Sequence, residues 1–224
     1  MSAFRTVWDG LDWSFVTQTL LSVVPALICI TLHEMAHGLV ALWLGDTTAR
    51  DAGRLTLNPL RHIDIWGLLM MVICGFGWAK PVPVNMYNFK NPKRGMALTA
   101  LAGPAANIIL SCLALALYGR VYASLYDSAV GAYVLQMIEL TAYLSCALAV
   151  FNILPIPPLD GSKVLFSLVS DRTYSWLMRY ERYGFLILMA LVFFNVISGP
   201  LSAATGWVYE KLFSIAQFTF GLVN

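Results

Sequence analysis

The chain has 224 residues, of which 59% are hydrophobic and only 12% charged, and its mean hydropathy is +0.71. A soluble domain carries about 25% charged residues, so this composition excludes an ordinary soluble protein and predicts several membrane spans in a lipid bilayer. The formal net charge is +2, and the basic residues are scattered through loops, which gives no indication of a nucleic-acid partner.

The N-terminal residues do not resemble a secretory signal. Arg5 is accompanied by Asp9 and Asp12, and no small-residue cleavage site follows, so we expect no signal peptide. The cysteines lie in apolar runs without C-x-x-C spacing, and we interpret them as small core residues: Cys29, Cys74, Cys112 and Cys146.

The first apolar stretch covers residues 14–44, more than the roughly 20 residues that one span needs, and Pro25 is expected to kink it. Its second half contains the motif H-E-x-x-H, with His33, Glu34 and His37. On a helix both imidazoles face one side and can bind one metal ion, while Glu34 can take a proton from a metal-bound water. Two buried histidines satisfied by neighbours are the alternative, but such groups in hydrocarbon usually mark function.

A polar segment, residues 50–66, follows. Leu55 and Leu57 alternate with polar residues, which is the periodicity of a strand. His62 also lies here, as a third metal ligand or, in the reading that we favour, an ordinary loop histidine. Residues 66–79 are apolar but reach only about 21 Å as a helix, so we predict a re-entrant segment.

Residues 80–89 alternate again, with Val82, Val84 and Met86 on one side. Pro81 and Pro83 lack the amide hydrogen of a central strand, which restricts any strand here to an edge position. A plain connecting loop is the alternative.

Two full spans follow, at residues 96–118 and 133–154. The first contains Gly103-Pro104-Ala-Ala-Asn107, whose small residues allow close helix approach. Asn107 either hydrogen-bonds a neighbouring helix or has a role in the site. Glu139 lies near the start of the second span and is expected to extend to the interface rather than to catalyse.

The second span ends in Asn152-Ile-Leu-Pro-Ile-Pro-Pro-Leu-Asp-Gly161, whose prolines leave backbone groups that hydrocarbon cannot satisfy. Such backbone lines a cavity or is buried in protein, and it places the carboxylate of Asp160 there. A last apolar run covers residues 183–197, and the amphipathic tail 207–224 lies in the interface or adds a short span. Without repeats or linkers, we expect one domain over 1–224, with its core at about 14–200.

The distribution of basic residues decides the topology. If 66–79 does not cross, segments 45–95 and 155–182 share one side and carry eleven of the fourteen lysines and arginines. The positive-inside rule makes that side cytoplasmic and puts Asp160 in the same half of the membrane as His33 and His37. A full crossing would separate Asp160 from the two histidines.

Three motifs in this order resemble the site-2 protease family of intramembrane zinc metalloproteases: the His33–His37 motif, Gly103-Pro104-x-x-Asn107, and Asn152-x-x-Pro155 through Asp160-Gly161. The resemblance covers roughly residues 25–165 and indicates a minimal, prokaryote-like member without a PDZ domain.

The resemblance implies that His33, His37 and Asp160 bind Zn²⁺, with Glu34 as general base and Asn152 near the substrate. It implies an all-α membrane protein, a multi-spanning helical bundle with a small membrane-associated β element. Val82 and Val84 are then candidates for holding an unwound substrate by strand addition, and Asn107 is a further candidate contact.

The function that we expect is intramembrane cleavage of single-span proteins in the cell membrane, near the cytoplasmic face. A metal-ion transporter using the same two histidines and aspartate is the rival reading. A carrier needs no glutamate beside the first histidine, and transporters often show repeats, which this chain lacks. A catalytically inactive relative that only binds proteins is a third reading, which the complete set of ligands and base disfavours.

Overall fold

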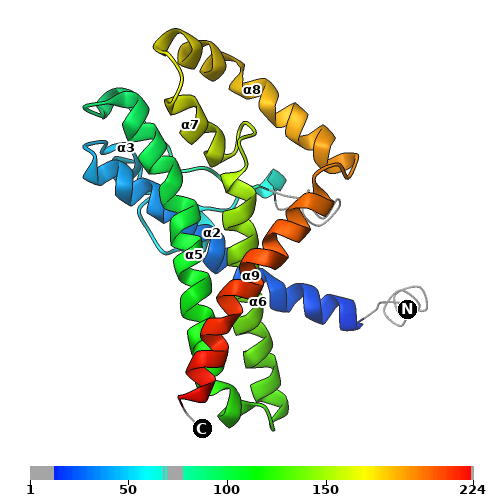
Figure 1. Cartoon of the computed structure of the whole chain (residues 1–224). Coiled ribbons are helices and arrows are strands. Elements are labelled where there is room, and N and C mark those ends of the chain that lie inside the picture. Colours follow the sequence, from blue (N-terminus) through cyan, green and yellow to red (C-terminus); the bar gives the residue numbers. More distant parts are fainter. Residues whose placement is uncertain (1–12, 68, 70–77, 223–224) are drawn as a thin grey trace, which may run out of the picture.

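The computed structural model describes residues 13–67, 69 and 78–222, and their regular structure is helical (Figure 1). No β-sheet occurs in this part of the chain, which confirms the predicted all-α class. The elements are α2 (Trp13–Trp43), α3 (Thr48–Asp51), the 3₁₀ turns η1 (Pro59–Arg61) and η2 (Met86–Asn88), α5 (Pro92–Leu125), α6 (Ala129–Ile153), α7 (Asp160–Ser167), α8 (Asp171–Phe193) and α9 (Ser198–Gly221).

Three helices in the described residues are long and apolar enough to cross a membrane: α2 from Leu21 to its end, α5 and α6. The end of α8 and all of α9 pass the same test together, with a bend of 87° between them. At this bend Asn195 has φ 58°, in the left-handed region that asparagine tolerates better than most residues. The chain is therefore a multi-pass membrane protein.

Helix α5 lies at the centre of the bundle and contacts α2, α6, α7 and α9. The hydroxyl of Ser111 donates to the carbonyl of Ala142 on α6 at 2.8 Å, and that of Ser145 donates to the carbonyl of Asn107 at 2.9 Å. Small residues and hydroxyls of this kind join helices where water offers no alternative partner. These two bonds join α5 to α6.

The C-terminal tail belongs to this bundle. Trp207 to Gly221 continue the helix that begins at Ser198, and α9 packs against α5 and α6. At the α5 contact, a Cβ atom on Gly119 would stand 2.0 Å from the carbonyl oxygen of Ala216, so only glycine permits this approach. The tail packs on the bundle through this contact.

The alternating segments are not strands. Residues 54–58 and 80–85 contain no strand, and the described residues hold a single isolated antiparallel bridge, between Ile63 and Ala79. Pro81 and Pro83 cannot donate to a ladder, and the side chains of Arg54, Glu34 and Asp46 bind the Lys80 carbonyl and the Val82 and Asn85 amides. The predicted re-entrant segment 66–79 falls largely on residues 68 and 70–77, which lie outside the described residues.

Candidate metal centre

Helix α2 places two imidazoles side by side. His33 and His37 are one turn apart, their ring centroids lie 4.6 Å from each other, and the rings meet edge to face. Both side chains are buried, with 5% and 9% of their residue surface exposed. The spacing of the H-E-x-x-H motif on a helix produces this pair directly.

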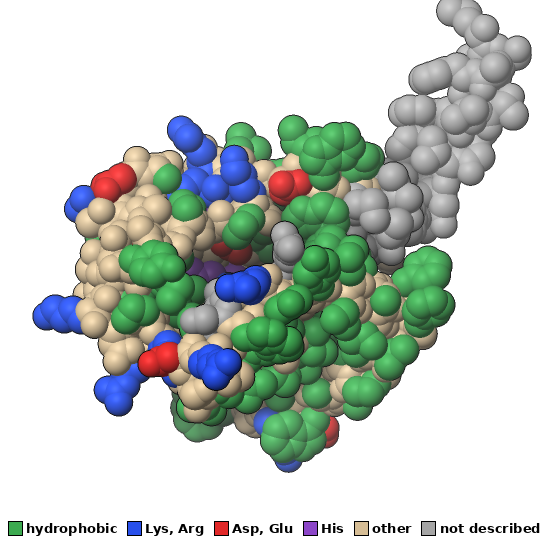
Figure 2. All heavy atoms as spheres, turned by 90° about the horizontal axis from the view of Figure 1, so that it is seen from above, with side chains coloured by type: hydrophobic (Ala, Val, Ile, Leu, Met, Phe, Trp, Pro, Cys, Tyr) green, Lys and Arg blue, Asp and Glu red, His purple; other side chains and the backbone are tan. Residues whose placement is uncertain are grey.

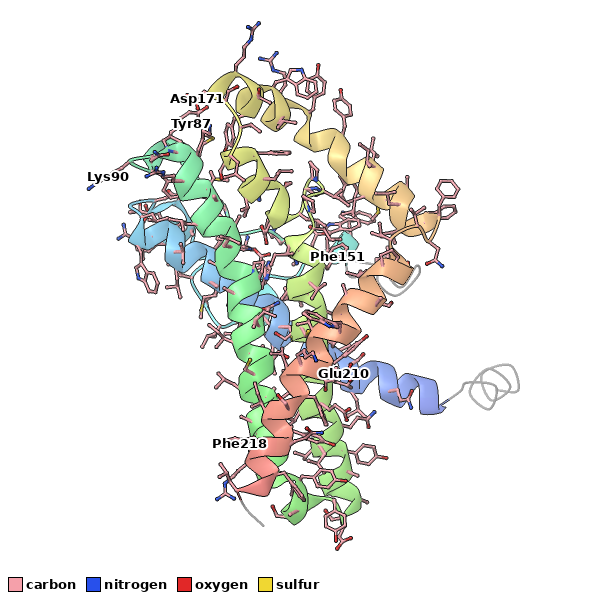
Figure 3. The ribbon with its side chains drawn as sticks, in the orientation of Figure 1. Tyr87, Lys90, Phe151, Asp171, Glu210 and Phe218 are labelled. Carbon is pink, nitrogen blue, oxygen red and sulfur yellow. The ribbon has the colours of Figure 1, made fainter. Side chains whose placement is uncertain are left out.

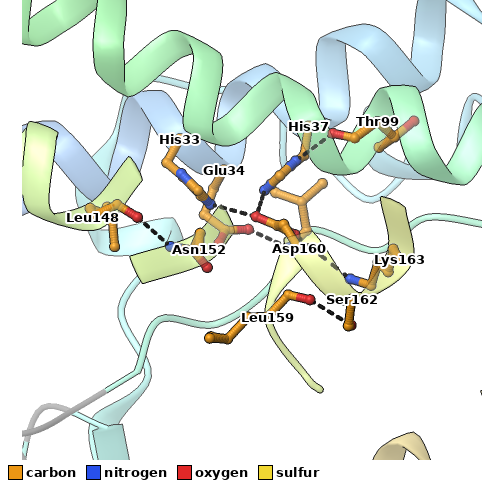
Figure 4. A network of polar contacts seen from close by, with 11 residues as sticks. His33, Glu34, His37, Thr99, Leu148, Asn152, Leu159, Asp160, Ser162 and Lys163 are labelled. Carbon is orange, nitrogen blue, oxygen red and sulfur yellow. Dashed lines mark hydrogen bonds and ion pairs between the residues drawn. The ribbon is translucent and has the colours of Figure 1, made fainter. Parts of the chain in front are cut away.

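The third ligand comes from the segment after α6. Asp160 is the first residue of α7, and its Oδ2 lies 3.2 Å from Nε2 of both His33 and His37 (Figure 4). Gly161 makes the tight turn possible, because a Cβ atom there would stand 2.0 Å from the carbonyl oxygen of Ile153. The structure thus brings together the three residues that the sequence predicts as ligands.

Hydrogen bonding around His37 turns its second ring nitrogen towards Asp160. Its Nδ1 lies 2.7 Å from the carbonyl oxygen of Thr99, which can only accept, so Nδ1 carries the proton. In the neutral ring Nε2 then has a lone pair, and it faces an Asp160 oxygen that also only accepts. The 3.2 Å contact therefore needs a positive charge, either a second proton on the ring or a metal ion, and two imidazoles and a carboxylate are a usual ligand set of zinc.

The charge state of Asp160 suits this role. Burial opposes its ionisation, but hydrogen bonds with His33 and His37 outweigh burial and hold the pKa of its carboxyl well below the usual range. The ammonium of Lys163 lies 3.8 Å from the other carboxylate oxygen and acts in the same direction. Asp160 is therefore a carboxylate at neutral pH and available to a cation.

Glu34 stands beside the ligands without joining them. The cluster of mutually close ligand atoms in the described residues contains His33, His37 and Asp160 only. The three candidate ligands line a cavity of about 610 Å³, and Glu34 lines it as well. The Oε2 atom of Glu34 accepts a hydrogen bond from the Val82 amide at 2.8 Å. The histidine side chains are visible in a recess in the view of Figure 2.

Most of the other predicted site residues line this cavity as well. Asn152, Val82 and Val84 do so, although the amide of Asn152 donates to the carbonyl of Leu148 on its own helix at 2.9 Å. Asn107 is fully buried and is not among the lining residues, a position that fits the interhelical role. Its substrate contact stays a prediction.

Two further predicted alternatives can be placed. His62 is buried and lines the cavity, but it lies outside the ligand cluster, and its Nε2 pairs with the carbonyl of Thr56 at 2.9 Å. Glu139 is exposed on α6 and is not among the cavity-lining residues.

Sequence reasoning missed the groups that support the site. Lys163 could have been noticed, since it follows Asp160 by one helical turn at the start of a helix. The carbonyl of Thr99 and the amide of Val82 are backbone groups, for which a sequence pattern gives no signal.

A glutamate beside three candidate metal ligands distinguishes two classes of metal-binding membrane protein. Hydrolysis of a peptide bond needs a group that takes a proton from water, whereas metal transit does not. Fold and site together define a membrane-embedded zinc metalloprotease.

Comparison with known proteins agrees, and the chain belongs to peptidase family M50, the site-2 protease family. The model of that family matches residues 119–195, which include Asn152 and Asp160. The chain is 37% identical over 175 residues to "Putative zinc metalloprotease YwhC" of Bacillus subtilis, covering 75% of this chain and 78% of that protein.

It is also similar to two proteins named "Putative zinc metalloprotease Rip2". The protein from Mycolicibacterium smegmatis is 29% identical over 210 residues, covering 92% of this chain and 76% of the relative. The protein from Mycobacterium tuberculosis H37Rv is 29% identical over 194 residues, covering 82% and 71%. No solved structure matches the chain.

Proposed function

We propose that this metalloprotease cleaves peptide bonds within or next to the transmembrane segments of single-span membrane proteins, near the cytoplasmic face of the cell membrane. The observation that carries the proposal is Asp160 Oδ2 at 3.2 Å from both imidazoles, in a cavity shared with Glu34 inside a membrane bundle.

His33, His37 and Asp160 hold the metal in this proposal. Zinc bound there supplies a Lewis acid that makes water a nucleophile at neutral pH. Glu34 takes the proton of the attacking water and passes it to the leaving amine. The Asn152 amide faces the same cavity and supports the oxygen of the scissile carbonyl as negative charge develops on it.

The substrate class follows from where the cavity lies. Its walls come from the spanning helices α2, α5 and α6 and from the extended segment around Val82 and Val84. A transmembrane helix hides its peptide bonds in intrahelical hydrogen bonds, so the substrate has to become extended before water reaches its carbonyl. Val82 and Val84 then contact the extended substrate.

The placement near the cytoplasm rests on charge. The two segments rich in lysine and arginine meet at one end of the bundle, where Lys93 forms an ion pair with Asp171 at 3.0 Å. Figure 3 shows Lys90 and Asp171 at this end and Phe218 at the opposite end. By the positive-inside rule, the end with Lys90 faces the cytoplasm.

The deciding experiment compares membranes that contain the active chain with membranes that contain Glu34→Gln, and searches by proteomics for shortened single-span proteins. Glutamine is nearly isosteric and keeps the fold and the zinc, but it cannot accept the proton. Glu139→Gln is the matched control, because this glutamate is exposed on α6 away from the cavity. Identical fragment patterns in the wild type and Glu34→Gln would overturn the proposal.

A further inference from the structure

The carboxylate of Glu34 has a backbone partner that no sequence motif predicts. The amide of Val82 donates to Oε2 of Glu34 at 2.8 Å, and both residues line the cavity that holds the metal ligands. Val82 is itself buried, with 8% of its surface exposed. One carboxylate oxygen of Glu34, the expected base, therefore accepts a hydrogen bond from the protein backbone.

The segment that carries this amide is fixed on both sides of Val82. Before it, the Lys80 amide donates to the carbonyl of His62 at 2.9 Å, and the Arg54 guanidinium donates to the Lys80 carbonyl at 2.6 Å. After it, the Asn85 amide donates to Oδ2 of Asp46 at 2.7 Å. These bonds hold the segment in place independently of Glu34.

Only one amide of the central stretch can make the contact. Pro81 and Pro83 have no N–H, so Val82 carries the single donor among these three residues. Two residues further on, the Val84 amide has no hydrogen-bond partner within the described part of the chain. The sequence Pro-Val-Pro-Val therefore offers one engaged donor and one free donor of the same residue type.

We propose that the Val82 amide is a positioning group for Glu34: it holds Oε2, so that the other oxygen stays directed at the attacking water. The inference rests on the proposed function, in which Glu34 is the general base. A glutamate side chain has several rotamers, and a base works only within hydrogen-bond reach of its proton. A misplacement of about 1 Å can cost about a hundredfold in rate.

The test replaces the amide at position 82 with an ester, by incorporating the α-hydroxy acid analogue of valine in the full chain. This change removes the N–H and keeps the side chain. We expect kcat to fall roughly ten- to hundredfold with KM nearly unchanged and zinc retained. The corresponding ester at Leu57 is the matched control, because Leu57 is exposed, lies outside the cavity lining and has an amide without a hydrogen-bond partner among the described residues. It should leave kcat within about twofold of the wild type.

A kcat of the Val82 ester equal to that of the Leu57 ester overturns the proposal. Loss of zinc from the Val82 ester also overturns it, because the amide would then support the metal ligands rather than the base.

Hydrogen exchange gives a reading that does not depend on turnover. With ¹⁵N-valine labelling, the Val82 amide should exchange slowly in the wild type and in Glu34→Gln, whose oxygen still accepts. It should exchange at least about tenfold faster in Glu34→Ala, where the acceptor is gone. Equal rates in all three proteins would overturn the inference. If the three proteins show the expected exchange rates but the wild type cleaves no substrate, only the proposed function is refuted.

Discussion

Gly103 lies so close to His37 that a Cβ atom on residue 103 would stand 2.5 Å from Nε2 of the imidazole. The same atom would stand 2.5 Å from Cε1 of His33. Helix α5 therefore supports both rings with bare backbone, and one turn earlier the carbonyl of Thr99 holds Nδ1 of His37. The two imidazoles pack against the backbone of α5 at Gly103, where any larger residue would clash with both rings.

Gly103→Ala is expected to displace both rings and to lower zinc content and proteolysis together. Adding even one methyl to a filled site forces side chains off their rotamers. Metal analysis of the purified protein measures this. Gly206→Ala is the matched control, since nothing lies within 4 Å of a Cβ atom there, and alanine should stabilise α9 slightly. Full zinc occupancy in Gly103→Ala would contradict the packing argument.

Asp160→Ala should bind less than a tenth of the zinc of the wild type at equal metal concentration, because two imidazoles alone leave the ligand set incomplete. Asp51→Ala removes an exposed aspartate on α3 and should keep one zinc per chain. If Asp160→Ala retained full zinc after dialysis, Asp160 would not be a ligand.

Removal of the carboxylate of Asp46 should loosen the segment before α5. This fully buried side chain accepts hydrogen bonds from the amide of Asn85 and the side-chain amide of Asn88, both at 2.7 Å. In Asp46→Asn, one acceptor oxygen is replaced by an NH₂ donor that faces these donors. This should lower the free energy of unfolding by about 1–3 kcal/mol. A lower Tm in detergent at neutral pH is the expected result, and a Tm equal to that of the wild type would refute it.

The effect of Asp46 depends on pH with a definite sign. Burial opposes its ionisation, but hydrogen bonds from Thr48, Asn85 and Asn88 lower its pKa below the ordinary value of 3.8. A lowered folded pKa stabilises the protein above the unfolded pKa, and this contribution disappears as pH falls through the folded pKa. The Tm difference between the wild type and Asp46→Asn should therefore be constant near neutrality and shrink below about pH 4. A Tm difference that grows as the pH falls would show that the pKa of Asp46 is not lowered in the folded protein.

The topology can be tested with single cysteines at exposed positions. Leu60→Cys and Lys90→Cys, on either side of the predicted re-entrant segment, should both react with an impermeant maleimide from the cytoplasmic side. Val130→Cys, exposed near the start of α6, should react only from the opposite side. Labelling of positions 60 and 90 from different sides would show that residues 66–79 cross the membrane.

That His33, His37 and Asp160 lie together was predictable, because the position of each residue has a cause that can be found in the sequence. The spacing of His33 and His37 is a property of any helix, and the charge count puts Asp160 in the same half of the membrane. The structure brings these three residues together. The class of fold followed in the same way, from apolar runs of the length of a membrane span.

The extended segments show where sequence reasoning fails. Alternation at Leu55, Leu57 and Val82 predicts exposed and buried sides of an extended chain, but it does not tell which groups bind the backbone. Here the side chains of Arg54, Glu34 and Asp46 bind the backbone groups that a neighbouring strand would otherwise bind. Each of them is far from its partner in the sequence. Such partners become visible only when the helices are placed.

The metal ligands come from α2 and α7, with the whole of α5 and α6 between them in the chain. An ion there would bind the folded chain and not the unfolded one, because unfolding separates the three ligands. It also favours the folded state in proportion to how tightly it binds. We therefore expect metal supply to influence the lifetime of the protein as well as its activity, because a chain that has lost its ion should open more readily to degradation.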